Sequence, residues 1–164
     1  MEMEGIYEEY HHMVYGYLIG LTGGDRELAE ELTQETFYRA VKNIHKFRGD
    51  SMISTWLCQI AKYAFYQQVD KKKRHGEVPI DTVPELYEQK QLEEALVDQE
   101  GKLAVFKIVQ KLPGQMKDVM MLRLSGELSF REIGEILGKS ENWARVTHYR
   151  AKQIIGKELR KDGK

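Results

Sequence analysis

The sequence predicts an all-α protein made of two small helical domains joined by an acidic linker. Apolar residues recur at spacings of three and four, the period of an amphipathic helix, and the alternation typical of strands is absent. The 164-residue chain has a net charge of −1, but its charges are unevenly spread. Residues 1–75 carry 10 basic and 11 acidic side chains, residues 76–100 carry one and eight, and residues 101–164 carry 14 and seven. We therefore expect domains at 1–75 and 101–164, with 76–100 as the linker.

Two helices are expected at the start of the N-terminal domain. The first should end at Gly23 and Gly24, and Asp25 can cap the second. One face of the first helix carries Tyr7, Tyr10, Val14, Tyr17, Leu18 and Leu21. The residues of the second helix that are expected to face the core are Leu28, Leu32, Ala40, Val41 and Ile44. Its other face forms an acidic surface of Glu27, Glu30, Glu31, Gln34 and Glu35.

A third helix is predicted from about Ser54 to Arg74, after a loop rich in polar and aromatic groups. Its inward residues should be Trp56, Leu57, Ile60, Ala61, Ala64 and Phe65. Segment 47–56 combines aromatics, a cation, a glycine and short polar side chains, and the helix ends in cations at 71–74. This pattern is typical of a site for single-stranded nucleic acid. Stacking of a base on an aromatic ring contributes about 1–3 kcal/mol of binding free energy, and cations neutralise the phosphates. An alternative interpretation explains the same residues. The aromatics would belong to the core, and the cations would end the helix because its macrodipole favours positive charge there.

The acidic linker should change conformation along its length. It begins at Gly76 and carries Pro79 and Pro84, which are unfavourable inside a helix, so its first part should be extended. From about Glu85 the pattern allows a helix, which Pro113 ends. The linker thus separates two helical domains of different charge balance.

Segment 128–152 reads as a complete helix-turn-helix. Ser129 and Glu132 form a capping box at the start of its first helix. Gly138 is placed to end that helix in a left-handed C-cap, and Ser140 can cap the second helix. The same caps also suit an amphipathic helical hairpin with no role beyond folding.

The faces of the two predicted helices favour DNA binding. Gly134 is small enough for the helices to cross closely. The apolar stripe of the first helix is Ile133, Ile136 and Leu137, and the inward face of the second is Ala144, His148, Ala151 and Ile155. The outward face of the second helix carries Glu141, Asn142, Arg145, Tyr149 and Lys152. Such a face can enter a major groove and present donors to base edges and phosphates.

Composition argues against several classes of protein. A single cysteine, Cys58, excludes an internal disulfide and a cysteine-based zinc cluster, and should be a small buried residue beside Trp56. His11, His12 and His45 lack metal-ligand spacing, so we expect no metal and no other cofactor. An apolar run near 18 residues is absent, and the acidic start is not typical of a signal peptide. We therefore expect a cytoplasmic protein that does not insert into a membrane.

No catalytic residues are expected. Gly138, Lys139 and Ser140 resemble the end of a phosphate-binding P-loop, but that motif requires a glycine where Ile133 stands. The lysine also lies in a turn between helices and not after a strand. A serine, cysteine or histidine constellation suited to nucleophilic catalysis is not visible in the sequence. A binding protein is therefore predicted in place of an enzyme.

The motifs together resemble the extracytoplasmic-function (ECF, group 4) sigma factors of the bacterial sigma-70 family. LAEELTQETFYRA (28–40) is similar to region 2.2, and FRGDSMISTWLCQIAKYAFYQQVDKKKR (47–74) is similar to regions 2.3 and 2.4. Segment 112–152, which contains the helix-turn-helix, resembles region 4. The resemblance implies a promoter-recognition subunit that binds core RNA polymerase, reads −35 duplex with its C-terminal domain and helps to open −10 DNA with its N-terminal domain.

The resemblance also implies roles for individual residues. Glu31, Gln34 and Glu35 would dock on the β′ subunit of core polymerase. The −10 element would be bound by Arg48, Gly49, Asp50, Ser51 and Met52 in a base-capturing loop, and by Trp56, Tyr63, Gln67 and Lys71 on the next helix. The −35 element would be bound by Ser140, Glu141, Asn142, Arg145, Val146, Tyr149, Arg150 and Lys152. Implied partners are promoter DNA, the β′ and β subunits, whose channels the linker would enter, and an anti-sigma factor that can be membrane-bound.

Some positions depart from the family pattern. Tyr63 and Gln67 stand where asparagine is usual, so the −10 preference can differ. Trp143 replaces a small or hydroxyl residue, and His148 occupies a position that is more often aliphatic, where half-buried packing is expected. The rival interpretation is a helix-turn-helix repressor with a helical sensing domain. It explains the C-terminal half equally well but leaves the acidic face of 28–40 and the loop 48–52 without a purpose.

Overall fold

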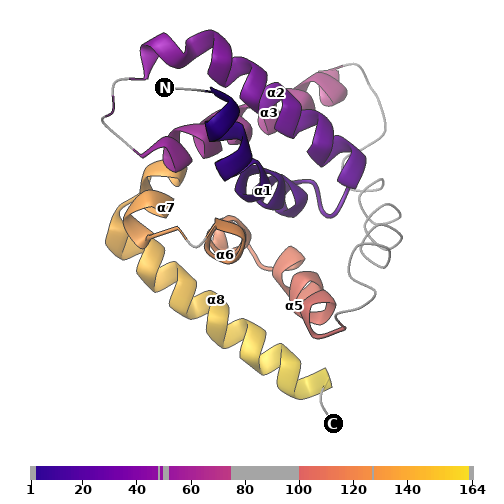
Figure 1. Ribbon diagram of the computed structural model, residues 1–164. Helices are drawn as coiled ribbons and strands as arrows, with labels where there is room; N and C mark the ends of the chain where they lie inside the picture. The colour runs from indigo at the N-terminus through magenta and orange to yellow at the C-terminus, as the bar shows by residue number, and fades with distance from the viewer. Residues whose placement is uncertain (1–2, 48, 50–51, 75–99, 127, 163–164) are drawn as a thin grey trace.

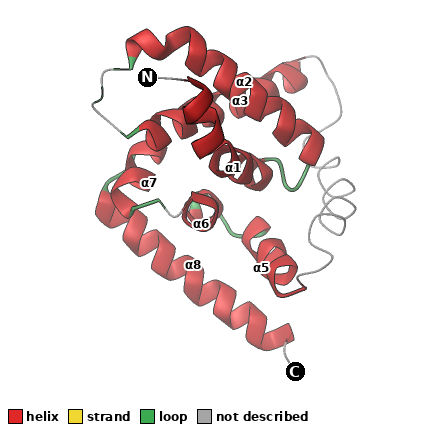
Figure 2. Cartoon of the chain, viewed as in Figure 1, coloured by secondary structure: helices red, strands yellow, loops and turns green. Residues whose placement is uncertain are grey.

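The computed structural model describes residues 3–47, 49, 52–74, 100–126 and 128–162 (Figure 1). Within these ranges all regular secondary structure is helical, as Figure 2 shows, and the predicted all-α fold is confirmed. The acidic linker lies outside the described residues except for Glu100. The seven α-helices of the described ranges are α1 (Met3–Leu21), α2 (Arg26–Asn43), α3 (Ile53–Arg74), α5 (Glu100–Gln110), α6 (Met116–Gly126), α7 (Phe130–Leu137) and α8 (Glu141–Asp162), and a short 3-10 turn, η1, spans Ile44–Lys46.

Helices α1, α2 and α3, here called the N-terminal module, pack around an apolar core. Gly23 and Gly24 have positive φ angles of 69° and 97°, which let the chain turn sharply after α1. Asp25 caps α2 as predicted, because its carboxylate accepts a hydrogen bond from the Leu28 N–H at 3.1 Å. Cys58 is fully buried in this core, which confirms its predicted structural role.

The buried face of α2 differs from the predicted one. The sequence pattern places Val41 in the core, but this side chain is 51% exposed, so that prediction is wrong. Thr33, Thr36 and Phe37 are buried in its place. Each threonine hydroxyl donates a 2.7 Å hydrogen bond to the carbonyl four residues earlier, and this satisfies it inside the core. Two polar residues therefore occupy core positions that an apolar pattern does not reveal.

Helices α5 to α8 form the C-terminal module, and its helix-turn-helix has the predicted caps. The Ser129 hydroxyl accepts a hydrogen bond from the Glu132 N–H, and the Glu132 carboxylate accepts one from the Ser129 N–H, both at 3.1 Å. Gly138 ends α7 in the left-handed conformation with a φ of 72°. At the start of α8 the Ser140 hydroxyl accepts a hydrogen bond from the Trp143 N–H at 3.0 Å.

The predicted close approach within the helix-turn-helix is made by Gly134 against the turn. A Cβ built at this position would lie 2.7 Å from the carbonyl oxygen of Lys139 and 2.9 Å from that of Ser140. Backbone atoms cannot move aside as a flexible side chain can, so only glycine fits here. The predicted inward residues Ile133, Ile136, Leu137, Ala144, Ala151 and Ile155 are buried, and His148 is half-buried.

The two modules pack directly against each other (Figure 1). Helix α6 lies along α1, and α7 lies against α3. Small residues permit the first approach, because a Cβ built on Gly16 would lie only 2.7 Å from the Cβ of Ser125, and one on Gly20 would overlap Met121. The sequence patterns leave the relative orientation of the modules open. The contact between them is therefore a finding of the structure.

Candidate nucleic-acid interface and docking face

One side of α8 carries the side chains expected to read duplex DNA. The Ser140 cap and the packing of α7 against α8 fix where this helix begins and which side faces solvent. The expected residues are all exposed: Ser140, Glu141, Asn142, Arg145, Val146, Tyr149, Arg150 and Lys152. The structure thus brings this set together on one helix and its cap. A helix of about 10–12 Å diameter matches a major groove about 12 Å wide.

Two of these side chains are held by neighbours one turn away on α8. Arg145 Nη2 donates a 2.8 Å hydrogen bond to Glu141 Oε2. The Tyr149 hydroxyl accepts a 2.7 Å hydrogen bond from Gln153 Nε2. Exposed ion pairs contribute only about 0–1 kcal/mol to stability, so the Glu141 contact matters more for the direction of Arg145. Gln153 was missed by the sequence analysis, although its spacing of four from Tyr149 is a usable signal.

A single aromatic ring of α7 lies beneath this part of α8. The guanidinium carbon of Arg145 lies 5.5 Å from the ring centroid of Phe130, and that of Arg123 lies 4.4 Å from it. The ring of His148 approaches the same ring with a centroid distance of 5.2 Å. Burial lowers the pKa of His148, and the positive charges of Arg123 and Lys152 lower it further. Neither Phe130 nor Arg123 was singled out from the sequence.

The residues expected at the −10 element are only partly brought together. Tyr63 is 62% exposed, and Gln67 and Lys71 follow it at spacings of four, so these three form an exposed strip along α3. Trp56 is half-buried against the core, and its ring centroid lies 5.1 Å from that of Phe47. Trp56 therefore fits the core interpretation of the aromatics, whereas Tyr63 lies outside the core.

The loop before α3 is described at two of its predicted residues. Gly49 is exposed and has a φ of 79°, a conformation that favours glycine. Met52 is 62% exposed, and its carbonyl accepts the 3.0 Å hydrogen bond from the Trp56 N–H in the first turn of α3. The other three predicted loop residues, Arg48, Asp50 and Ser51, lie outside the described residues.

The expected docking face on α2 is partly occupied by an internal ion pair. Glu31 and Gln34 are exposed, whereas Glu35 is half-buried and accepts a 2.7 Å hydrogen bond from Arg39 Nε. A groove of about 470 Å³ runs between α2 and α3. Its polar lining includes Glu31, Glu35, Arg39, Gln67 and Lys71. The groove therefore connects the expected docking face with the exposed strip of α3.

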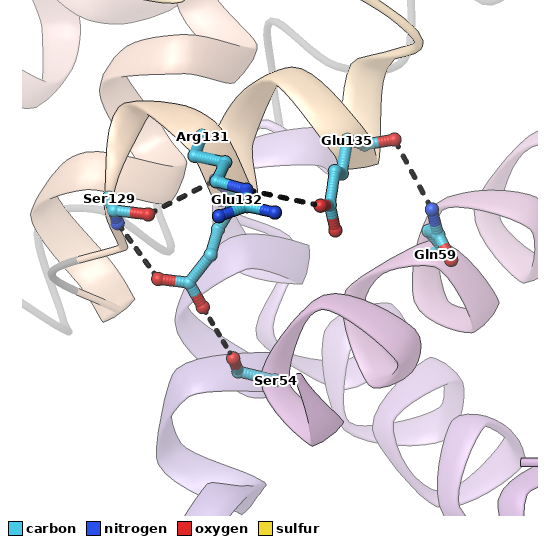
Figure 3. A network of polar contacts seen from close by, with 6 residues as sticks. All are labelled: Ser54, Gln59, Ser129, Arg131, Glu132 and Glu135. Atoms are coloured by element: carbon cyan, nitrogen blue, oxygen red, sulfur yellow. Dashed lines mark hydrogen bonds and ion pairs between the residues drawn. The ribbon is translucent and has the colours of Figure 1, made fainter. Parts of the chain in front are cut away.

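A polar network joins the two modules between α3 and α7 (Figure 3). Ser54 donates a 2.8 Å hydrogen bond to Glu132 Oε2, while the other oxygen of this carboxylate completes the Ser129 capping box. Burial alone would raise the pKa of Glu132, but the hydrogen bonds from Ser129 and Ser54 outweigh it and lower the pKa.

The other end of α7 is bound by the same helix. Gln59 Nε2 donates to the Glu135 carbonyl at 3.2 Å, and Lys62 Nζ donates to the Ile136 carbonyl at 2.8 Å. The last carbonyls of a helix lack partners within it, and a cation near them is favoured by the helix dipole. Helix α3 thus contacts α7 at both of its ends.

A buried carboxylate lies on the other side of the contact between modules. Asp118, in the first turn of α6, is only 8% exposed. Burial raises its pKa, while the charges of Lys117 and Lys62 act in the opposite direction. Burial and the Asp118 charge together raise the pKa of Tyr17 well above its ordinary value. Asp118 was missed by the sequence analysis, because an acidic residue in a first helical turn is normally exposed.

Two family descriptions match the chain. Residues 6–75 match "Sigma-70 region 2", and residues 102–155 match "Sigma-70, region 4". ECF RNA polymerase sigma factor SigM of Bacillus subtilis is 31% identical, covering 94% of this chain and 93% of its own length. RNA polymerase sigma factor YlaC of the same organism is 32% identical, with 97% and 92% covered. ECF RNA polymerase sigma factor SigW, also of that organism, is 30% identical, with 94% and 87% covered.

A solved structure has the same fold. It is the sigma factor RpoE in complex with the anti-sigma factor NepR from Bartonella quintana. The two chains superpose with a TM-score of 0.70 over 96% of each, at 16% sequence identity. None of the helices in the described ranges combines the length and the apolar composition of a membrane-spanning segment.

Proposed function

The chain belongs to the ECF group of the sigma-70 family, and on this premise we propose how its two modules divide promoter recognition. It is a sigma factor, which directs promoter recognition and transcription initiation by RNA polymerase and is not an enzyme. The C-terminal module, within residues 101–164, reads −35 duplex. The N-terminal module, within residues 1–75, binds core polymerase and helps to open −10 DNA. The acidic segment 76–100 links them.

The exposed side of α8 carries the −35 proposal. Arg145 offers a planar fork that matches the two acceptors of guanine, and Arg150 and Lys152 supply positive charge for phosphates. The side chains are exposed while the opposite side of the helix is buried, so α8 can enter a major groove without unfolding any core contact. Val146 adds an apolar contact of the kind that suits a thymine methyl group.

The exposed strip of α3 carries the −10 proposal. Tyr63 offers a ring face on which an unstacked base can stack, and Lys71 offers a phosphate contact. Gln67 can make hydrogen bonds to a base edge between them. The loop residues Arg48 to Met52 would hold a flipped base. Tyr63 and Gln67, in place of asparagine, would then set the −10 preference.

Docking on core polymerase uses Glu31, Gln34 and Glu35. This face is acidic, with Glu31 and Gln34 exposed and Glu35 half-buried beside Arg39. The core does not depend on it, since Leu32, Thr36 and Ala40 supply the buried side of α2. Core polymerase places the protein in the cytoplasm, and the linker would enter channels of the β′ and β subunits. An anti-sigma partner, soluble or membrane-bound, is supported by the fold shared with RpoE of the RpoE–NepR complex.

Promoter spacing requires the modules to separate on the polymerase. Elements centred near −10 and −35 are about 25 base pairs apart, which is about 85 Å at roughly 3.4 Å per base pair. A compact chain of this length has a radius of gyration of only about 15 Å. With α3 against α7, the two reading surfaces cannot reach both elements at once. Core polymerase would therefore bind the separated form.

Reversal of charge on the docking face tests the proposal. Glu31→Lys with Glu35→Lys should abolish holoenzyme assembly in a pull-down with core polymerase. Thermal stability should change little, because the exposed Glu31 carboxylate and the partly exposed ion pair between Glu35 and Arg39 each contribute only about 0–1 kcal/mol. The matched control is Glu8→Lys with Glu9→Lys, which reverses two exposed charges on α1. Normal assembly by the α2 variant, or equal loss in the control, would show that docking occurs elsewhere.

A further inference from the structure

The ring of Phe130 is contacted by charged and aromatic side chains from two other helices. Phe130 is the first residue of α7 and follows directly after the Ser129 cap, so the capping box fixes its backbone. Arg123 comes from α6, and Arg145 and His148 come from α8. This ring is the point where the end of α6, the start of α7 and the DNA-facing helix meet.

Arg123 anchors one side of this cluster. Its Nη1 donates a 2.6 Å hydrogen bond to the Leu128 carbonyl, and its guanidinium carbon lies 4.4 Å from the Phe130 centroid. The first distance is that of a hydrogen bond and the second that of a cation–π contact, so the Arg123 side chain is held at two points. The Phe130 ring is thereby fixed between a bound cation and α8, and it offers a rigid surface to Arg145.

Arg145 is held in a way that leaves donors free. A guanidinium has five N–H donors in its plane, and stacking on a ring uses the face of the group, not these donors. The bond from Nη2 to Glu141 uses one donor. The Phe130 contact and the Glu141 bond together restrict a side chain that is 52% exposed. The remaining donors keep a defined direction along the exposed side of α8.

We propose that Phe130 is a positioning residue for −35 recognition, which directs the Arg145 fork toward its base pair. The inference rests on the proposed base contact of Arg145. Phe130 itself touches no DNA in this role, since it lies on α7 beneath α8. Its aromatic face is the required property. A leucine would fill the same apolar contact with the core but would offer a guanidinium no such face.

The experiment uses holoenzyme assembled from the full-length protein and core polymerase. Relative affinities are measured by competition for promoters in which each −35 base pair is replaced in turn by the other three. Phe130→Leu should reduce discrimination by about 2–5-fold at one base pair, and this should be the base pair that Arg145→Ala also affects. Phe130→Tyr keeps the aromatic face and should retain discrimination. In the Arg145→Ala background, Phe130→Leu should cause no further change.

A matched control separates positioning from a general effect on packing. Phe106→Leu makes the same substitution in a half-buried aromatic of α5, which packs against the core without approaching Arg145. It should leave the base preference unchanged, and thermal unfolding of every variant reports any loss of stability. A Phe130→Leu protein that loses affinity equally for all promoters, or whose effect adds to that of Arg145→Ala, would overturn the inference.

The outcomes also separate this inference from the proposed function. If Arg145→Ala alters one base preference and Phe130→Leu alters none, the positioning role alone is wrong. If Arg145→Ala leaves all −35 preferences intact, the proposed base contact fails, and the role of Phe130 fails with it. Loss of discrimination in Phe130→Tyr would likewise exclude the aromatic face as the required property.

Discussion

Helices α3 and α8 have the same length of 22 residues, and both carry residues proposed to contact DNA, yet they differ in what else they do. Helix α8 keeps one side free, and the side chains on it are held by neighbours such as Glu141 and Phe130. Helix α3 has two structural roles in addition to carrying the exposed strip. It completes the N-terminal core, and it binds both ends of α7 through Ser54, Gln59 and Lys62.

The difference shows how the contact between modules affects each reading surface. Separation of the modules would leave the exposed side of α8 unchanged. It would uncover the first turn of α3, where Ser54 is only 7% exposed and follows Met52 by two residues. The closed arrangement therefore covers part of the proposed −10 surface and leaves the proposed −35 surface open. A variant that affects one helix alone should change one surface alone.

The largest expected effect comes from disrupting the close contact between Gly134 of α7 and the turn before α8. Gly134→Ala would place a Cβ against backbone carbonyls of Lys139 and Ser140, so the turn must shift. Overpacking of this kind costs about 1–3 kcal/mol, and we expect the upper part of that range because the obstructing atoms are backbone. Binding of −35 duplex should fall as well, while holoenzyme docking through α2 persists.

Gly156→Ala is the control, since it lies on α8 itself. A Cβ there would have one neighbour, the end of the Arg160 side chain at 3.7 Å, which is ordinary contact. Alanine in a helix interior should stabilise by up to about 1 kcal/mol relative to glycine. Thermal unfolding measures both variants. Equal melting temperatures would mean that the Gly134 contact is not required.

The helices and caps could be predicted from the sequence because their causes are local. Asp25, the pair Ser129 and Glu132, and Gly138 each act within four residues of the chain, and each is found in its predicted role. Burial within α2 was harder to predict. Val41 is apolar yet 51% exposed, whereas Thr36 is polar yet buried, because its hydroxyl bonds to its own helix.

The site could be predicted only where one helix supplies it. The exposed side of α8 follows from helical periodicity, so its residues were identified from spacing. The hydrogen bonds between α3 and α7 join residues 74 to 78 positions apart, and no pattern in one segment indicates them. Phe130 reads as an ordinary apolar residue at a helix start. Its relation to Arg145 depends on how α7 and α8 cross, which is a tertiary property.

A smaller effect should follow from weakening the α3–α7 contact. Ser54→Ala with Lys62→Met removes two side-chain donors at the ends of α7 and keeps the apolar stem of the lysine. Each lost hydrogen bond costs about 0.5–1.5 kcal/mol. Small-angle X-ray scattering of the free protein should then give a radius of gyration above about 15 Å. The −35 affinity of α8 should be unchanged.

Lys72→Met is the matched control, because Lys72 is an exposed lysine of the same helix. Its scattering curve should equal that of the unmodified protein. If the double variant also stays compact, the Ser54 and Lys62 hydrogen bonds are not required to hold the modules together, and the remaining contacts, including that between α1 and α6, are sufficient.

The smallest effect concerns pH and the other side of the contact, where Asp118 meets α1 and α3. Its pKa is raised in the folded protein, chiefly by burial, so the folded state holds this proton more tightly than the unfolded chain does. The resulting stabilisation is complete below the ordinary pKa of the carboxyl and is lost as pH rises through the raised value. At neutral pH the ionised carboxylate is therefore unfavourable in its buried position. Asp118→Asn should increase the free energy of unfolding at pH 7, and the gain should shrink as the pH is lowered.

Urea unfolding of both proteins across this pH range measures the difference, with Asp70→Asn as the control for an exposed carboxylate on α3. The control should show no comparable gain at pH 7. Tyr17 and Tyr66 lie within the electrostatic reach of Asp118 from α1 and α3, so its charge acts at the contact between modules. Removing this charge should therefore favour the contact between the modules. When Asp118→Asn is added to the Ser54 and Lys62 substitutions, the triple variant should remain compact in scattering. A destabilised Asp118→Asn protein at pH 7 would mean that Lys62 and Lys117 more than compensate the burial of the charge, and that this carboxylate holds the modules together.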